Sequence, residues 1–103
     1  MAKKSTTQLS LDKLRSEGYR ADIVERRTGP VMHDLFTIFD IVAIRGGETV
    51  GVQVTSRSNI SSRIRKIEDS EALSDVRDAN WTIYVHGWDK YEGEYRCKVV
   101  DLS

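Results

Sequence analysis

The sequence has little that would support several common classes of protein. Its 103 residues include one cysteine, Cys97, which excludes an intramolecular disulfide framework and a multi-cysteine zinc site. The 16 basic and 16 acidic residues give no net charge, so attraction to nucleic acid would have to come from a local surface. No apolar run approaches the roughly 18 residues of a membrane span. We therefore expect a cytoplasmic protein without a membrane segment.

The length fits one domain with a single core. We expect residues 1–5 to be a flexible tail and residues 6–103 to form the domain. Capping residues, apolar periodicity and turn residues predict its elements. They are a helix over about 6–17 capped by Thr6 or Thr7 and ended by Gly18, strands over 19–26, 35–44 and 49–55, a helix capped by Ser58–Asn59, a short helix over 71–78, and a hairpin of 81–85 with 95–99, with a loop over 26–33.

This order, α-β-β-β-α-(α)-β-β, predicts an α/β (α+β) fold. We expect a mixed five-stranded sheet with helices packed on it.

Asp40 is unusual because it lies within the most apolar segment of the chain, 35–44. An isolated buried carboxylate costs several kcal/mol unless it is neutralised or paired. If the turn 45–48 pairs Ile44 with Thr49, then Asp40 falls opposite Gln53, and Thr55 shares their face of the sheet. This arrangement is consistent with a functional site. It is equally consistent with a buried polar pair, or with a carboxylate that caps a backbone amide.

The segments Phe39-Asp40-Ile-Val-Ala-Ile44 and Val52-Gln53-Val54-Thr55-Ser56 resemble the core of the PD-(D/E)XK nuclease superfamily, which has a restriction-endonuclease-like fold. The resemblance covers about residues 5–68 and is nearest to small Holliday-junction resolvases. It implies a metal-dependent endonuclease that hydrolyses DNA with Mg²⁺ or Mn²⁺. In this family Asp40 would bind the metal, Gln53 would take the second acidic position, and the carbonyl of Val54 would be a backbone ligand.

Two positions depart from the family pattern. Thr55 stands where the family has a catalytic Lys, and Gln53 is neutral. Asp34 and Glu25 are the best candidates for further metal ligands, because the acidic residue of the family's first helix is replaced here by Thr7 or Gln8. Lys66 or Arg63, from the following helix, would replace the missing Lys in space. Replacement of the Lys and loss of activity are both open from the sequence.

Charge is segregated after the motif. The stretch 57–66 contains basic residues and no acid, and it includes hydroxyl and amide side chains suited to phosphate. By itself such a stretch is more often a solvated helix face, but its place after the Gln53–Thr55 strand favours DNA contact. The predicted DNA-binding residues are Arg57, Ser58, Asn59, Arg63, Arg65 and Lys66.

The sequence leaves three functions open. The first is a small, homodimeric, metal-dependent endonuclease acting on DNA, including branched DNA. The second is a module of the same fold with a degenerate site, which binds nucleic acid or a protein without cutting. The third is a structural or adaptor protein with no nucleic-acid role. The missing Lys favours the second function, and the buried Asp40 favours the first.

Overall fold

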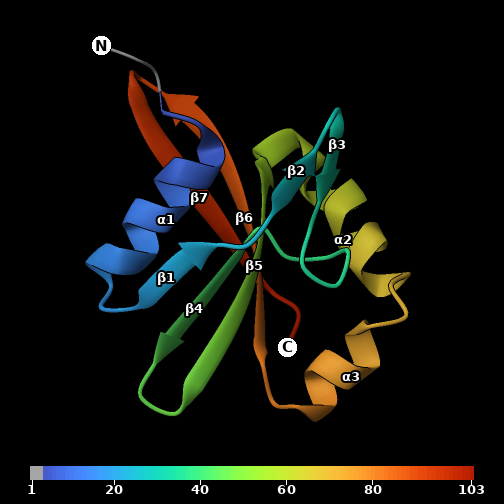
Figure 1. The fold of residues 1–103 in the computed structure, drawn as a ribbon. Coiled ribbons are helices and arrows are strands. Elements are labelled where there is room, and N and C mark those ends of the chain that lie inside the picture. The colour runs from blue at the N-terminus through green and yellow to red at the C-terminus, as the bar shows by residue number, and fades with distance from the viewer. Residues whose placement is uncertain (1–3) are drawn as a thin grey trace.

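A mixed five-stranded sheet forms the centre of the computed structural model, which describes residues 4–103 (Figure 1). Its strands lie in the order β1-β4-β5-β6-β7, and only β5 and β6 run parallel. Their bounds are β1 Arg20–Ile23, β4 Ile41–Arg45, β5 Glu48–Ser56, β6 Thr82–Tyr91 and β7 Glu94–Asp101. The predicted fold class, a mixed five-stranded sheet flanked by helices, is confirmed.

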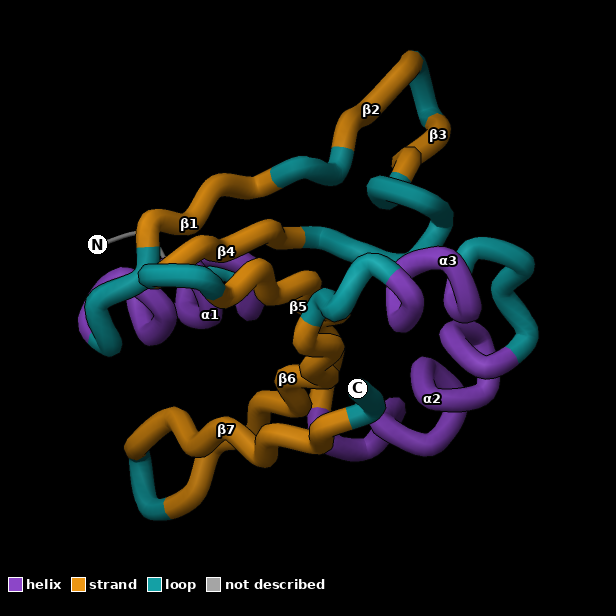
Figure 2. The backbone as a smooth tube through the Cα atoms, turned by 90° about the horizontal axis from the view of Figure 1, so that it is seen from below, coloured by secondary structure: helices purple, strands orange, loops and turns teal. Residues whose placement is uncertain are grey.

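Helices cover both faces of the sheet (Figure 2). Helix α1, Thr6–Ser16, packs on one face, while α2, Ile60–Glu68, and α3, Leu73–Asp78, pack on the other. A parallel pair of strands needs a long crossover, and the 3₁₀ turn η1, Arg57–Asn59, with α2 and α3 provides it between β5 and β6. None of the helices within residues 4–103 has the length and apolar character that crossing a membrane requires.

The alternation of side chains along β5 divides the core into two layers. Val50, Val52 and Val54 pack with Leu11 and Leu14 of α1. The intervening residues, Gly51 and Gln53, face the side of α2 and α3, where their neighbours include Phe39 and Val85. Gln53 is therefore a polar residue on an otherwise apolar inner face.

The ends of α1 follow local chemistry. The N-cap of the helix is Ser5, one residue before the predicted Thr6. The Ser5 side chain accepts a hydrogen bond of 3.1 Å from the Gln8 amide. Residues 1–3 of the predicted tail lie outside the described residues. Gly18 has φ +92°, the left-handed conformation predicted for the end of this helix. The N-cap residue of α2 is Asn59, as predicted, but its side chain makes no capping hydrogen bond, and η1 leads into the helix.

The prediction of one strand over 35–44 was wrong. Residues 35–39 form a closed loop, in which Leu35 and Phe39 exchange backbone hydrogen bonds of 2.9 Å, and β4 begins only at Ile41. Phe36 and Thr37 have positive φ angles, 56° and 61°, which no strand contains. The segment is apolar because the loop inserts Ile38 and Phe39 into the core, where both are fully buried. An apolar run records burial and does not distinguish a strand from a buried loop.

The predictions of a strand over 19–26 and a loop over 26–33 were also wrong in part. Strand β1 ends at Ile23, and the next residues form a separate hairpin of β2, Arg26–Thr28, and β3, Val31–His33. Gly29, with φ 59°, and Pro30 make its turn. Figure 2 shows this hairpin standing apart from the main sheet.

The C-terminal hairpin is longer than predicted, and His86 lies within β6 and not at its end. The ring of His86 is buried, and its Nδ1 lies 2.9 Å from Ser10 Oγ of α1. Trp88 Nε1 donates to the same oxygen at 2.7 Å. Burial lowers the pKa of His86 to about 4, so the ring is neutral and joins α1 to the sheet.

Substitution of Gly51 by Ala tests how tightly the loop around Asp40 is packed. A Cβ at position 51 would lie 2.5 Å from the buried Phe39 ring, whereas one at Gly47 would meet nothing within 4 Å. We expect Gly51→Ala to lower the free energy of unfolding by about 1–3 kcal/mol through overpacking. Gly47→Ala should change it by less than about 0.5 kcal/mol. Chemical denaturation measures both, and equal values for the two variants would contradict this packing.

Candidate metal centre and cleft

The strand register places Asp40 beside Gln53. As predicted, Ile44 pairs with Thr49, and the ladder between β4 and β5 ends at Ile41 and Val52. Asp40 follows immediately, and its carboxylate oxygen Oδ2 accepts a hydrogen bond of 2.8 Å from Gln53 Nε2. The Val54 amide donates to the same oxygen at 2.7 Å. Both structural alternatives, the polar pair and the capped amide, are therefore present in the molecule.

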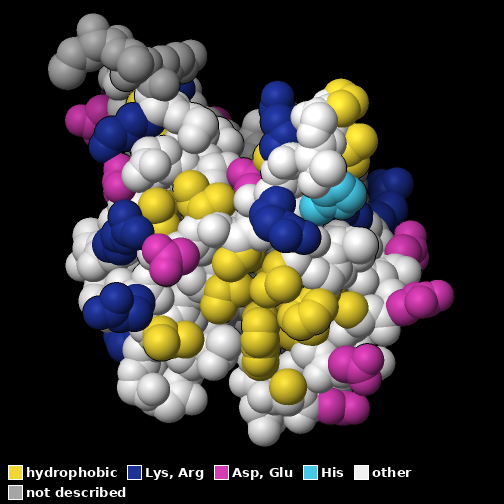
Figure 3. Space-filling view, in the orientation of Figure 1, with side chains coloured by type: hydrophobic (Ala, Val, Ile, Leu, Met, Phe, Trp, Pro, Cys, Tyr) yellow, Lys and Arg dark blue, Asp and Glu magenta, His cyan; other side chains and the backbone are white. Residues whose placement is uncertain are grey.

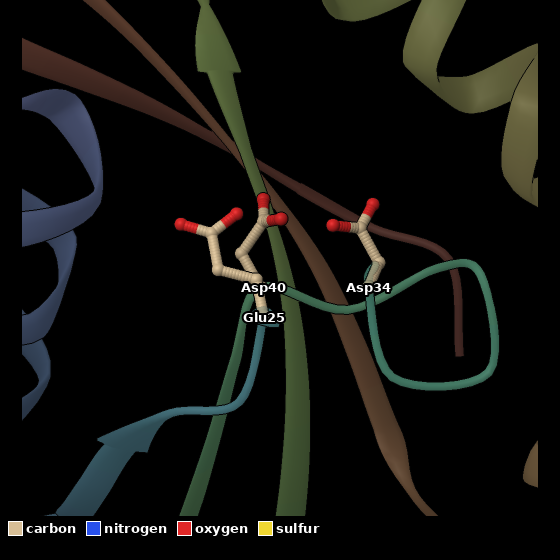
Figure 4. Close-up of side chains that lie close together, drawn as sticks. All are labelled: Glu25, Asp34 and Asp40. Atoms are coloured by element: carbon tan, nitrogen blue, oxygen red, sulfur yellow. The ribbon is translucent and has the colours of Figure 1, made fainter. Parts of the chain in front are cut away.

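Two further carboxylates join Asp40. One carboxylate oxygen of each of Glu25, Asp34 and Asp40 lies within 4.8 Å of the others. Figure 4 shows the three side chains beside β5, with their carboxylates in one region. Glu25 and Asp34 flank the β2–β3 hairpin, in which Arg26 pairs with His33. The hairpin therefore returns Asp34 to Glu25, and the loop that follows brings Asp40 to both.

The donor set fits a hard divalent cation. Carboxylate oxygens are the protein ligands of Mg²⁺, and opposite ligands of an ion with bonds of about 2.1 Å lie about 4 Å apart. One oxygen of each carboxylate lies within 4.8 Å of the others, an upper limit somewhat wider than the spacing of ligands around a bound ion. Glu25, Asp34 and Asp40 are the residues that would hold such an ion.

The electrostatics of Asp40 point the same way. The pKa of its carboxyl is raised from 3.8 to about 8, chiefly by burial and also by the neighbouring charges of Asp34 and Glu25, while the Val54 amide bond opposes the shift. Without a cation the cluster therefore retains a proton near neutral pH. A divalent ion would take the place of that proton, because carboxylate ligands bind in their ionised form.

Basic side chains from α2 complete the site. Lys66 Nζ lies 2.8 Å from Asp34 Oδ2 and 3.4 Å from Gln53 Oε1. Arg63 Nε lies 3.4 Å from Thr55 Oγ1, and Thr55 itself is buried. Positions 63 and 66 are three residues apart on the helix and share one side of it. The neighbouring helix thus places two basic side chains beside Thr55 and Gln53.

These groups line a cleft of about 290 Å³. Thr7 of α1 and Met32 of β3 border it together with the acidic cluster and the two basic residues of α2. Thr7, or its neighbour Gln8, stands where the resemblance implies an acidic residue. Since neither is charged, the negative charge of the cleft comes from Glu25, Asp34 and Asp40. The lining residues are Thr7, Glu25, Met32, Asp34, Asp40, Gln53, Val54, Arg63 and Lys66.

The predicted DNA-binding residues do not form one surface. Arg63 and Lys66 line the cleft, whereas Arg57 and Ser58 border a different hollow with Trp88. Arg65 is exposed on α2 and belongs to neither set of lining residues, nor does Asn59. The charged stretch 57–66 is divided because the chain changes from a 3₁₀ turn to a helix at Ile60.

Sequence reasoning missed the place of Met32 in the cleft wall, because residues 26–33 were predicted to be a loop. Gly29-Pro30 between short runs containing Val31 and Met32 was the available signal for a hairpin.

The raised pKa of Asp40 predicts a specific pH dependence of stability in EDTA. Because the pKa of Asp40 is about 8 in the folded state and the ordinary pKa of an Asp carboxyl is 3.8, the folded state binds an extra proton between these values. The contribution of this proton to the free energy of unfolding is present below about pH 4 and is lost as the pH rises through 8. Asp40→Asn removes the titration, so the stability of this variant relative to wild type should increase from pH 5 to pH 8 in thermal unfolding. Asp78→Asn, at an exposed position, should run parallel to wild type. A parallel course for Asp40→Asn would contradict the shift.

Comparisons with known proteins give a likeness of fold and no match of sequence. No family model matches the chain, and no curated protein sequence matches it. The fold is similar to that of Archaeoglobus fulgidus Hjc, described as a Holliday junction resolvase from an archaeal hyperthermophile. The match has a TM-score of 0.47 and 16% sequence identity, and it covers 92% of this chain and 87% of that chain. At this level the likeness assigns no role to any residue of the present chain.

Proposed function

We propose that this protein is a metal-dependent nuclease that hydrolyses phosphodiester bonds in DNA, including branched DNA. The observation that supports the proposal is the convergence of Glu25, Asp34 and Asp40 in one cleft, next to Lys66. A cluster of three carboxylates beside one cation, in which the pKa of Asp40 is raised, is costly as a purely structural device. The same carboxylates could bind Mg²⁺ or Mn²⁺ next to a phosphate of the substrate.

Each residue has a chemical task in this proposal. Asp40, Asp34 and Glu25 hold the divalent ion, which when bound supplies charge at the phosphoryl oxygen and an acidified water. Gln53 holds the Asp40 carboxylate in place through its amide donor. Lys66 provides the positive charge that the phosphate needs as negative charge develops on it. Thr55 keeps Arg63 at the edge of the cleft through its hydroxyl.

A second function is favoured by one specific contact. Lys66 is already engaged by Asp34 and Gln53, so its charge partly neutralises the cluster that would hold the metal. If that pair persists when DNA binds, the chain is a nucleic-acid-binding module with a degenerate site. A homodimer, and a place in the cytoplasm, remain predictions for either function.

A cleavage assay separates the two functions. End-labelled duplex, single-stranded and four-way-junction DNA are incubated with the protein in Mg²⁺, Mn²⁺ or EDTA. We expect metal-dependent cleavage by wild type and its loss in Asp40→Asn, because one ligand carboxylate is removed, while Asp78→Asn cuts normally. Calorimetry with Mn²⁺ should give the same order for metal binding. Binding of DNA without cleavage in any metal would support the binding module instead.

Lys66→Met tests whether the helix supplies the missing cation. The side chain keeps its length but loses its charge, so cleavage should fall by about 10²–10³-fold while metal dependence is retained. Lys66→Arg should recover part of this loss. Lys98→Met, which removes an exposed cation of β7, is the matched control and should cut like wild type. A rate in Lys66→Met within twofold of wild type would show that Lys66 serves only to pair with Asp34.

A further inference from the structure

The β2–β3 hairpin has an unusual surface. All six of its strand residues are exposed, although a two-stranded hairpin is at best marginally stable alone and gains from packing. Val31 and Met32 are 51% and 46% exposed. Figure 3 shows hydrophobic side chains next to basic ones at the place that this hairpin occupies in Figure 1. The apolar residues of the hairpin therefore contribute little to the core.

The hairpin is also locally basic in a chain without net charge. Residues 26–33 contain Arg26 and Arg27 and no acidic residue. Arg27 lies against Met32, with its Nε 3.4 Å from the sulfur, and Arg26 pairs with His33. Neither arginine has an ion pair within residues 4–103. Free guanidinium groups of this kind suit phosphate oxygens.

The position of the hairpin connects this surface with the cleft. Met32 lines the cleft, and Glu25 and Asp34 lie at the base of the two strands. A phosphate backbone approaching the acidic cluster would be repelled by it unless basic groups flanked the entrance. Arg63 and Lys66 of α2 provide such groups within the cleft, and Arg26 and Arg27 provide them on the hairpin.

We propose that the β2–β3 hairpin is a DNA-binding arm that selects branched or distorted DNA. Arg26 and Arg27 contact backbone phosphates, and Val31 and Met32 pack against bases that are unstacked at a branch point. Apolar side chains used in this way act as wedges at opened base steps, and a junction removes part of the unstacking cost. The proposal rests on the proposed function, since it assumes that DNA occupies the adjacent cleft.

Two double variants separate the two roles of the arm. Fluorescence anisotropy with a labelled four-way junction and a duplex of the same arm sequence, in EDTA, measures binding without cleavage. Arg26→Ala/Arg27→Ala should weaken binding to both DNAs and reduce the slope of log K against log salt by about 0.9 for each lost contact. Val31→Thr/Met32→Gln keeps the size and charge of the hairpin. It should reduce an about tenfold preference for the junction over the duplex to less than about threefold.

The control carries the same loss of charge on another hairpin. Lys90→Ala/Lys98→Ala removes two exposed cations from β6 and β7 and should leave junction binding and its salt dependence unchanged. Thermal unfolding of each variant checks that the fold is retained.

Each remaining outcome counts against a defined claim. If wild type binds DNA and both arm variants bind with its affinity, slope and preference, the arm is overturned while the proposed function stands. Equal binding of junction and duplex by wild type overturns the selection of branched DNA. If wild type binds no DNA, the proposed function fails and the arm fails with it, and the exposed apolar residues would then serve a protein partner.

Discussion

The burial of the Asp40 carboxylate is the constraint on which the rest of the site depends. A charge in this position is stable only with donors or cations around it. The Val54 amide and the Gln53 amide supply two donors, and the pKa of about 8 indicates that they do not suffice. Asp34 and Glu25 add further negative charge, which raises the pKa of Asp40. The molecule therefore has a local demand for positive charge, which a divalent ion would meet.

Helix α2 places one positive charge at this cluster. The helix follows β5 directly and returns over the sheet because β5 and β6 are parallel. Ile60 and Ile67 anchor its buried side to Ile83 and Val85. With these residues fixed, Lys66 is directed at Asp34 and Gln53. Packing in the core and charge in the cleft are thus set by one helix.

The charged residues near Asp40 stand at other positions than in the family pattern that the sequence resembles. The strand β5 offers neutral side chains at Gln53 and Thr55, where that pattern has an acid and a lysine. In the proposed function, Glu25 and Asp34 at the base of a hairpin would take the place of the acid, and Lys66 on a helix would take the place of the lysine. Each of these residues comes from an element that is adjacent in space but separate in sequence.

The sequence alone determined those features of this protein that depend on neighbouring residues or on the pairing of two adjacent strands. The number and order of the main-sheet strands, the end of α1 at Gly18 and the contact of Asp40 with Gln53 follow from periodicity, glycine chemistry and the length of one turn. The proximity of Glu25, Asp34 and Lys66 to Asp40 was a hypothesis that spacing could not establish. It depends on how the β2–β3 hairpin folds back and on how α2 crosses the sheet.

The tertiary structure alone decided two other features. Residues 35–39 are as apolar as a strand but form a buried loop, because burial and not extension selects such residues. The raised pKa of Asp40 likewise has no signature in the sequence, since desolvation and the field of neighbouring carboxylates exist only once distant segments meet.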